Sequence, residues 1–292
     1  MARRGGGPFR PGRGGAILRC QVLFPETVAI DKMTPADTAP KILTRDDGAT
    51  IAYHAIPGKS PGVVFLTGFM SDMTGGKALA LEAFCRAHGQ AFLRFDYTGH
   101  GASSGAFEDG TIGRWADDTL TALDTLCEGP QVLVGSSMGG WIMLLAALWR
   151  PRRVAGLLGI ATAADFTVDL IPHGLTEEQK AALERNGVVY VPSDYGPEPT
   201  PLTKKLLEDG SNHLVLRDDI ALDVPVRLIH GMKDPDVPWE TAMRIADRLR
   251  SRDVEITLIK DGDHRLSEPA DLERLCATLD ALLGHIEDAP PF

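Results

Sequence analysis

Apolar and polar residues follow two different periods along the chain from residue 41 onward. Short runs of almost only apolar residues, at 62–66, 91–95, 132–134 and 154–160, are separated by longer amphipathic stretches. Continuous apolar runs of this length are typical of parallel strands that are buried on both faces. Because these runs alternate with helical stretches, the sequence predicts an α/β fold with a mostly parallel sheet and helices on both of its faces.

Further elements complete this α/β pattern. Residues 41–44 and 50–54 flank the turn sequence DDGA and predict an antiparallel hairpin ahead of the first buried strand. Two later strands are predicted at 226–230 and 254–259, each with a helix after it. The helices between the earlier strands are predicted at about 77–88, 115–127 and 140–149.

The alternation of strands and helices stops between about residues 163 and 225, where no strong strand is predicted. Residues 176–186 have a helical pattern with Thr176 as the N-cap, two glutamates in the first turn and a glycine directly after the last turn. A second short helix is predicted at 201–208. We interpret the segment at about 165–222 as a small helical lid over the carboxyl edge of the sheet. A long loop without a function is the simpler alternative, although insertions of this length usually carry a function.

The first 38 residues differ from the rest in composition. They are rich in glycine, proline and arginine, and five arginines precede the first acidic residue, Glu26. Such a segment cannot bury a core, so residues 1–38 are predicted to be a disordered leader. They are either an Arg-rich organelle-targeting segment or a misassigned start, with translation beginning at Met33. The many glycines and prolines favour the second interpretation. The folded domain is expected at 39–288.

The composition is that of an ordinary soluble globular protein, with 292 residues, 43% of them hydrophobic and 24% charged. A net charge of −10 argues against nucleic acid or an anionic membrane as a partner. No apolar run reaches the roughly 18 residues of a transmembrane helix. The four cysteines are widely spaced and no histidine–cysteine cluster has ligand spacing, so we expect reduced thiols, no metal and no cofactor.

The motif GSSMG at residues 135–139 follows an apolar strand and precedes a helix, which is the context in which G-x-S-x-G forms a nucleophile elbow. Only Ser137 has glycine both two residues before and two residues after it, whereas Ser136 is flanked by Val134 and Met138. The elbow brings neighbouring backbone very close to the serine, and glycine has no Cβ that would clash there. Ser137 is therefore the predicted nucleophile, although a Gly/Ser turn that leads into a helix would show the same motif.

A serine hydroxyl needs a base that takes its proton and an acid that orients this base. In this fold the order along the chain is serine, acid, histidine, each on a loop after a strand. After Ser137, only His264 follows a late strand and precedes the last helix, so His264 is the predicted base. The other histidines after Ser137 lie at the end of a strand, in the lid or in the last helix: His230, His173, His213 and His285.

Two carboxylates follow the strand at 226–230 and qualify as the acid. Asp234 comes earlier on the loop and is closer to the strand end. Asp236 stands next to Val237 and Pro238, where a carboxylate could simply favour the start of the following helix. We predict Asp234 as the acid and keep Asp236 as the alternative.

Two backbone N–H groups are needed to hold the oxyanion of a tetrahedral intermediate. In this fold one comes from the residue after the nucleophile, which is Met138, and the other from the loop after an early strand. That loop contains Gly68 and Phe69, and the N–H of Phe69 is the predicted second donor.

Longer motifs surround these site residues. They are GSSMGGW at 135–141, ATAAD at 161–165, HGMKD at 230–234, VPW at 237–239 and DHR at 263–265. Over roughly residues 50 to 283 they resemble the abhydrolase-domain family of acyl-protein thioesterases, within the α/β-hydrolase superfamily. The resemblance implies the α/β-hydrolase fold, with the nucleophile at Ser137, the acid at Asp234 and the base at His264.

This family includes mitochondrial palmitoyl-protein thioesterases of animals that also hydrolyse acyl glucuronides, and it has bacterial relatives. The chain departs from the family pattern at Pro235 and Asp236, where an acidic residue followed by an aliphatic one is expected. The leader departs completely. We therefore predict a bacterial cytoplasmic protein, or a mitochondrial one if the leader is a transit peptide.

The site residues and the resemblance together predict a serine hydrolase that cleaves acyl thioesters or esters through an acyl-enzyme. Its substrate would be an acylated small molecule or an S-acylated protein, as in depalmitoylation. The alternatives are a general carboxylesterase or acyl-glucuronide esterase, a C–C hydrolase, and a hydrolase-like binding module that is not an enzyme. Apolar lid side chains could hold an acyl chain or simply pack against the main domain: Leu170, Ile171, Leu175, Val188, Val189 and Tyr190.

Overall fold

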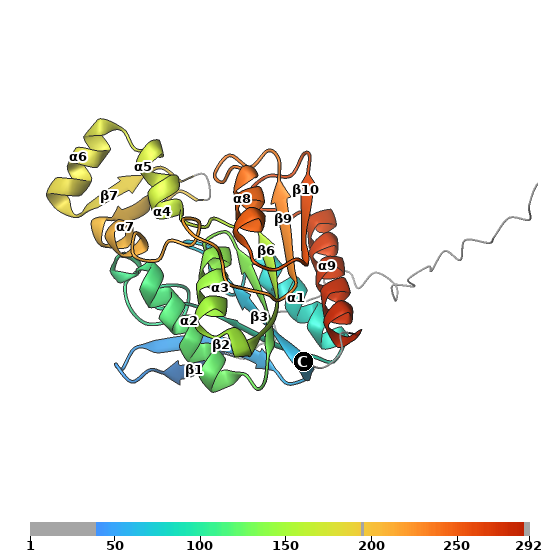
Figure 1. Ribbon diagram of the computed structural model, residues 1–292. Helices are drawn as coiled ribbons and strands as arrows, with labels where there is room; N and C mark the ends of the chain where they lie inside the picture. The colour runs from blue at the N-terminus through green and yellow to red at the C-terminus, as the bar shows by residue number, and fades with distance from the viewer. Residues whose placement is uncertain (1–38, 194–195, 289–292) are drawn as a thin grey trace, which may run out of the picture. The chain divides into compact units, whose positions relative to one another are not determined.

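The computed structural model describes residues 39–193 and 196–288. The predictions for the leader at 1–38, including a start at Met33, lie outside the described residues. The folded part is an α/β structure in which one sheet is flanked by helices, as the alternation of apolar runs and amphipathic stretches predicted (Figure 1).

The sheet has eight strands in the order β1-β2-β4-β3-β5-β6-β9-β10. The first two strands form the predicted antiparallel hairpin, β2 also pairs antiparallel with β4, and all later pairs are parallel. The strands are β1 (Lys41–Thr44), β2 (Thr50–Ile56), β3 (Lys59–Leu66), β4 (Gln90–Phe95), β5 (Gln131–Ser136), β6 (Val154–Ile160), β9 (Val226–Gly231) and β10 (Val254–Ile259).

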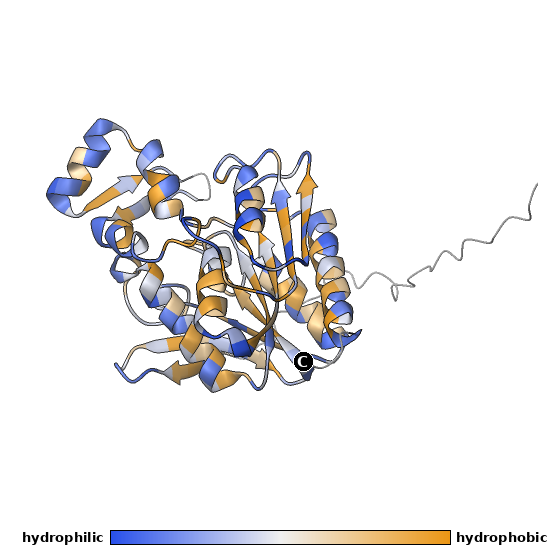
Figure 2. Ribbon diagram, viewed as in Figure 1, coloured by the Kyte–Doolittle hydropathy of each residue, from blue (hydrophilic) through white to orange (hydrophobic). Residues whose placement is uncertain are grey.

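Helices cover both faces of this sheet because successive side chains of a strand point to opposite sides. On β5, Leu133 belongs to the core under α2, α3 and α8, whereas Val132 and Val134 belong to the core under α1 and α9. Figure 2 shows apolar strands inside and hydrophilic outer helix faces. The helices are α1 (Gly76–Ala87), α2 (Ile112–Leu126), α3 (Met138–Trp149), α8 (Glu240–Arg248) and α9 (Pro269–Asp288), with the short turns η2 (Phe107–Asp109) and η3 (Pro151–Arg153).

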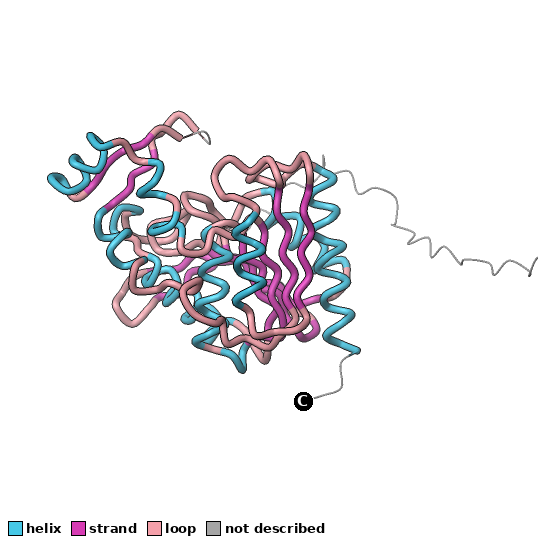
Figure 3. The backbone as a smooth tube through the Cα atoms, turned by 45° about the horizontal axis from the view of Figure 1, so that its top comes forward, coloured by secondary structure: helices cyan, strands magenta, loops and turns pink. Residues whose placement is uncertain are grey.

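The lid is inserted between β6 and β9 and lies to one side of the sheet (Figures 1 and 3). The predicted helix after Thr176 is present. The Thr176 hydroxyl accepts from Gln179 N–H, the Gln179 side chain accepts from Thr176 N–H, and Gly187 ends the helix in the left-handed conformation with φ 76°. The lid contains α4 (Phe166–Asp169), α5 (Ile171–Gly174), α6 (Glu177–Asn186), β7 (Val188–Val191), β8 (Thr200–Thr203) and α7 (Lys204–Gly210).

The sequence predicts no strong strand in this segment, and the structure contains two short ones. β7 and β8 form an antiparallel pair, and the helix predicted from residue 201 begins only at Lys204. Each strand has four residues, which is too short for a period to show in the sequence, and the two become a sheet only by pairing with each other. The proline at 201 is tolerated because a two-stranded sheet has edge strands only.

Several of the apolar lid side chains have packing partners. Leu175 and Val189 lie in a small buried cluster with Leu183 and Leu202, while the ring of Tyr190 is exposed and its hydroxyl donates to Glu108. No helix within residues 39–193 and 196–288 is both long and apolar enough to span a membrane.

Candidate active site

Ser137 stands on the sharp turn between β5 and α3, with φ 54° and ψ −120°. A residue other than glycine rarely adopts a positive φ, and it does so only where the surroundings enforce it. A Cβ on Gly135 would lie 2.4 Å from the carbonyl oxygen of Gly139, and one on Gly139 would lie 2.2 Å from that of Leu66. Both flanking glycines are therefore required by close backbone contacts, which is the steric reason inferred from the motif.

The structure brings the predicted nucleophile, base and acid together. His264 lies on the loop between β10 and α9, with Nε2 2.9 Å from Ser137 Oγ and Nδ1 2.7 Å from Asp234 Oδ2. The carboxylate of Asp234 is fully buried and the imidazole is 13% exposed. With the proton on Nδ1 donated to Asp234, the lone pair on Nε2 can accept the hydroxyl hydrogen of Ser137.

Asp234 is held as an anion by its hydrogen bonds. The backbone N–H groups of Asp236 and Val237 donate to its Oδ1 at 2.9 and 2.8 Å. Burial would raise the pKa of Asp234, but hydrogen bonds from His230, His264 and Val237 N–H outweigh it and hold this pKa well below its usual range.

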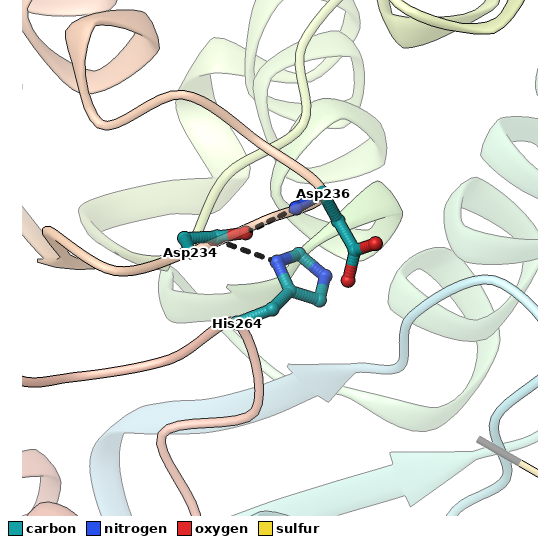
Figure 4. A group of neighbouring side chains, drawn as sticks. All are labelled: Asp234, Asp236 and His264. Carbon is teal, nitrogen blue, oxygen red and sulfur yellow. Dashed lines mark hydrogen bonds and ion pairs between the residues drawn. The ribbon is translucent and has the colours of Figure 1, made fainter. Parts of the chain in front are cut away.

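Asp236, the alternative acid, occupies a different position. Its carboxylate points away from Asp234 and lies beside the far side of the His264 ring (Figure 4). Asp234, Asp236 and His264 each offer one ligand atom within 4.8 Å of the others, so this group is the candidate cation site among the described residues. The carboxylate of Asp234 is already engaged by two histidines and two backbone N–H groups, which leaves it poorly placed to bind a cation.

His230 is a site residue that sequence reasoning missed. Its place at the end of a strand gives no sign of a role, yet its fully buried ring places Nε2 3.0 Å from Val237 O and 3.2 Å from Asp234 Oδ2. An N–H on Nε2 can donate to both oxygens, which ties the acid to β9. The signal available in the sequence was the HGMKD motif, in which this histidine stands four residues before Asp234.

The two predicted oxyanion donors flank the nucleophile. Met138 is the first residue of α3, and N–H groups in the first turn of a helix have no acceptor within that helix. On the other side, the ideal Cβ position of Gly68 lies 3.4 Å from Ser137 Cβ, so the loop that continues into Phe69 passes directly over the serine. The Phe69 ring packs edge-on against Phe107 at 4.8 Å, which holds the loop in place.

The loop that carries His264 is hydrogen-bonded to α1, which lies on the same face of the sheet as α9. Lys77 donates through Nζ to the carbonyl oxygen of Arg265 and, at 3.2 Å, to Ser267 Oγ. Burial lowers the pKa of Lys77 to about 8. The ring of His264 is therefore oriented by its hydrogen bond to Asp234, and the loop that carries it is held by the bonds to Lys77.

Comparisons with known proteins give one family. The alpha/beta hydrolase family model matches residues 63–277. "Palmitoyl-protein thioesterase ABHD10, mitochondrial" from Homo sapiens is 43% identical over 283 residues, covering 96% of this chain and 91% of that protein. The protein of the same name from Bos taurus is 44% identical over 250 residues, covering 85% and 81%.

Solved structures give the same result. "Alpha/beta hydrolase domain-containing protein 10 from mouse" superposes with a TM-score of 0.79 at 42% identity, covering 85% of this chain and 100% of that chain. A putative hydrolase from Agrobacterium vitis S4 superposes with a TM-score of 0.79 at 41% identity, covering 84% and 97%.

The match to the human protein extends beyond the folded domain. A match that covers 96% of the chain must extend into residues 1–38, because residues 39–292 alone make up a smaller share. The alignment with this relative therefore includes part of the predicted leader.

Proposed function

The chain belongs to the alpha/beta hydrolase family and is a hydrolase, and from this premise we propose that it cleaves acyl thioesters or esters with Ser137, His264 and Asp234 as its catalytic triad. The observation that carries the proposal is the pair of hydrogen bonds made by one imidazole, 2.9 Å to Ser137 Oγ and 2.7 Å to Asp234 Oδ2. A buried carboxylate, an oriented histidine and a strained serine in this chain order are what nucleophilic acyl transfer requires.

The geometry supports a two-step reaction. His264 takes the proton of Ser137 as the oxygen attacks the acyl carbonyl carbon, and Asp234 stabilises the imidazolium that forms. The N–H groups of Phe69 and Met138 hold the oxyanion of the tetrahedral intermediate. His264 then gives its proton to the leaving thiolate or alkoxide and, in the second step, activates the water that hydrolyses the acyl-enzyme.

The charge state of Asp234 suits this role. Because its pKa lies well below the usual range, this carboxylate is ionised at neutral pH. A permanent negative charge next to Nδ1 keeps the proton on that nitrogen and leaves the Nε2 lone pair free to act as the base. His230 adds a second hydrogen bond to the same carboxylate from the opposite side.

For the substrate we propose an S-acylated protein or an acylated small molecule. The relatives named palmitoyl-protein thioesterase support the thioester. A general carboxylesterase or acyl-glucuronide esterase and a C–C hydrolase use the same triad and remain the alternatives. A binding module without activity is disfavoured, since His264 is hydrogen-bonded to both Ser137 and Asp234, as a catalytic triad requires.

The experiment is hydrolysis of a graded substrate set by the protein and by Ser137→Ala. The set comprises thioesters from acetyl to palmitoyl, the matching oxygen esters and one acyl glucuronide. Turnover that favours long thioesters and is lost in Ser137→Ala supports depalmitoylation. Preference for short oxygen esters or for the glucuronide indicates a general esterase. No Ser137-dependent turnover on any of them contradicts acyl hydrolysis.

The location in the cell is part of the same proposal. Relatives that match most of this chain are named as mitochondrial, so we propose the mitochondrial address, and the bacterial cytoplasm stays the alternative. A fusion of residues 1–38 to a fluorescent protein, compared with the chain from Met33 onward, tests whether the leader directs import.

A further inference from the structure

The oxyanion loop, residues 67–73, leads from the end of β3 past the nucleophile. Ser71 N–H donates to Gly68 O at 3.1 Å and closes a turn that contains Phe69 and Met70. Met70 has a φ of 54°, which a residue other than glycine adopts only where its surroundings enforce it. The turn that presents the proposed donor, Phe69 N–H, is therefore strained and depends on contacts outside itself.

The far end of the oxyanion loop is fixed at Met73, which is 2% exposed. Its N–H donates to Asp96 Oδ1 at 2.7 Å, and its carbonyl oxygen accepts from Arg94 Nη1 at 2.9 Å. Arg94 lies on β4, Asp96 directly follows this strand, and β4 is the neighbour of β3 in the sheet. Both polar backbone groups of Met73 are thus bound by buried side chains that the sheet holds in place.

Asp96 also binds the loop that follows β4. Its second oxygen, Oδ2, accepts from Ala102 N–H at 2.9 Å. The backbone comes so close that a Cβ on Gly101 would lie 2.1 Å from this oxygen. The two oxygens of one carboxylate therefore accept from N–H groups of two different loops, and the carboxylate joins these loops to each other.

A structural ion pair does not explain this buried acid. Arg94 pairs with Glu82 on α1 rather than with Asp96. Burial raises the pKa of Asp96, against hydrogen bonds from Ala102 N–H and Met73 N–H, so folding disfavours the charged form of the acid. Buried acids with a perturbed pKa gather at functional positions, and this one is bonded to the loop of the proposed active site.

We propose that Asp96 is a positioning residue of the oxyanion hole: by accepting from Met73 N–H and Ala102 N–H, it holds the strained turn in the conformation that directs Phe69 N–H at the oxyanion. The proposal rests on the proposed function, because Phe69 N–H acts as a donor only when Ser137 attacks a carbonyl carbon. Asp96 acts through Met73 and the residues that lead back to Phe69, not on the reacting atoms.

The ring of Phe69 is a rival anchor for the same turn. It packs edge-on against Phe107, Trp115 and Phe166, with ring centroids 4.8, 5.9 and 5.7 Å away. Ring packing fixes the side chain of Phe69, whereas hydrogen bonds to the backbone fix the peptide groups of the loop. The two anchors differ in what they predict. If ring packing is sufficient, the oxyanion hole survives the loss of the Asp96 carboxylate.

The first test is the steady-state kinetics of Asp96→Asn, which keeps the size of the side chain. An amide has one acceptor oxygen and one NH₂ group, so it can accept from only one of the two N–H groups and opposes the other. Removal of an oxyanion donor costs about 10²–10³-fold in kcat. We expect kcat to fall at least about tenfold and KM to stay within about threefold, because the oxyanion forms only in the transition state.

Asp118→Asn is the matched control. The carboxylate of Asp118 is fully buried, and burial raises its pKa as well. It accepts from Thr98 N–H at 2.8 Å and from Arg45 at 2.7 Å, rather than from the oxyanion loop. We expect kcat of Asp118→Asn within about threefold of the wild-type value. Equal falls of kcat in the two variants would point to a general loss of packing and overturn the proposal.

An alkyl trifluoromethyl ketone separates positioning from folding. Such a ketone adds to Ser137 as a hemiketal, whose oxyanion occupies the oxyanion hole and whose ¹⁹F resonance follows its ionisation with pH. We expect the ionisation constant of the hemiketal hydroxyl to fall at least about tenfold in Asp96→Asn and to keep its wild-type value in Asp118→Asn. An unchanged ionisation constant in folded Asp96→Asn overturns the proposal. Should Asp96→Asn not fold, Asp96→Ser, whose hydroxyl still accepts from one N–H group, takes its place.

The failure of this proposal can be told from the failure of the proposed function. If the wild-type protein turns over none of the graded acyl substrates and forms no hemiketal, acyl hydrolysis at Ser137 fails, and the role of Asp96 fails with it. If Ser137-dependent turnover is present but Asp96→Asn keeps both kcat and the ionisation constant of the hemiketal, the role of Asp96 fails alone.

Discussion

The carboxyl edge of the sheet and the lid are built in different ways. At the sheet edge, Ser137 is bonded to the end of β6 and the loop after it, from its N–H to Ile160 O and from Ala163 N–H to its own carbonyl oxygen, and the carboxylate of Asp234 is fully buried. The lid has its own small core of four buried side chains and meets the main domain partly through exposed polar contacts, such as Tyr190 to Glu108 at 2.7 Å. Regions with few buried apolar contacts open locally at lower cost. The triad therefore rests on the sheet, whereas the lid has few buried contacts of its own and reaches the site through Phe69, which packs against the lid cluster and against Phe166.

The largest expected difference concerns the two aspartates of one loop. Asp234→Asn should lower kcat by roughly 10³–10⁴-fold, because the amide favours the wrong tautomer of His264 and no longer stabilises its charge. Asp236→Asn should change kcat by less than about threefold, since an exposed carboxylate is screened by water. Steady-state kinetics on one substrate checks both. A large loss in Asp236→Asn together with a small one in Asp234→Asn would move the acid from Asp234 to Asp236.

The same contrast should appear in stability when a methyl group is added to a glycine. Gly139→Ala puts a Cβ 2.2 Å from the carbonyl oxygen of Leu66, so we expect it to lower the free energy of unfolding by about 3 kcal/mol or more. Gly174→Ala, in α5 of the lid, meets no atom within 4 Å and should be neutral or stabilising by up to about 1 kcal/mol. Denaturant unfolding measures both, and a harmless Gly139→Ala would contradict the steric account of the turn.

Two buried aspartates should affect the pH dependence of the free energy of unfolding in opposite directions. Asp234 has a lowered pKa, so its contribution is present above the unfolded value of about 4 and is lost as pH falls toward the folded value. Burial raises the pKa of Asp165, at the start of the lid, against hydrogen bonds from Val215 and Leu216 N–H, so its contribution falls as pH rises from about 4. In urea unfolding between about pH 3 and pH 6, Asp234→Asn should flatten the rise of stability with pH and Asp165→Asn should steepen it. If both variants changed the slope of the free energy of unfolding against pH in the same direction, the opposite roles of Asp234 and Asp165 would be refuted.

The smallest effect is expected from the contact between the lid and the main domain. Tyr190→Phe removes the hydrogen bond to Glu108 on the surface, so the free energy of unfolding should change by less than about 1 kcal/mol. We expect kcat to stay within about twofold and only KM to respond. Glu108→Gln, which keeps an acceptor for the tyrosine, is the matched control. A tenfold loss of kcat in Tyr190→Phe would show that the lid takes part in the chemistry after all.

The sequence predicted the parts of the molecule that depend on neighbours in the chain. The apolar runs predicted every strand of the eight-stranded sheet, and the Thr176 cap and its following helix were predicted to within a residue. Ser137, Asp234 and His264 were predicted because each follows a strand, and parallel strands bring their carboxyl ends to the same edge. The glycines around Ser137 were predictable for a similar reason, since a sharp turn creates its own close contacts.

Only the tertiary structure decided the features that join distant segments. β7 and β8 lie eight residues apart and have four residues each, so their pairing depends on the lid packing and leaves no period to read. His230 was misjudged because its place at the end of a strand says nothing of the loop that folds back over it. The loop that carries Phe69 is joined to the loop after β4 because Asp96 accepts a hydrogen bond from each of them. Local patterns set which elements form, whereas burial and long-range hydrogen bonds are properties of the assembled fold.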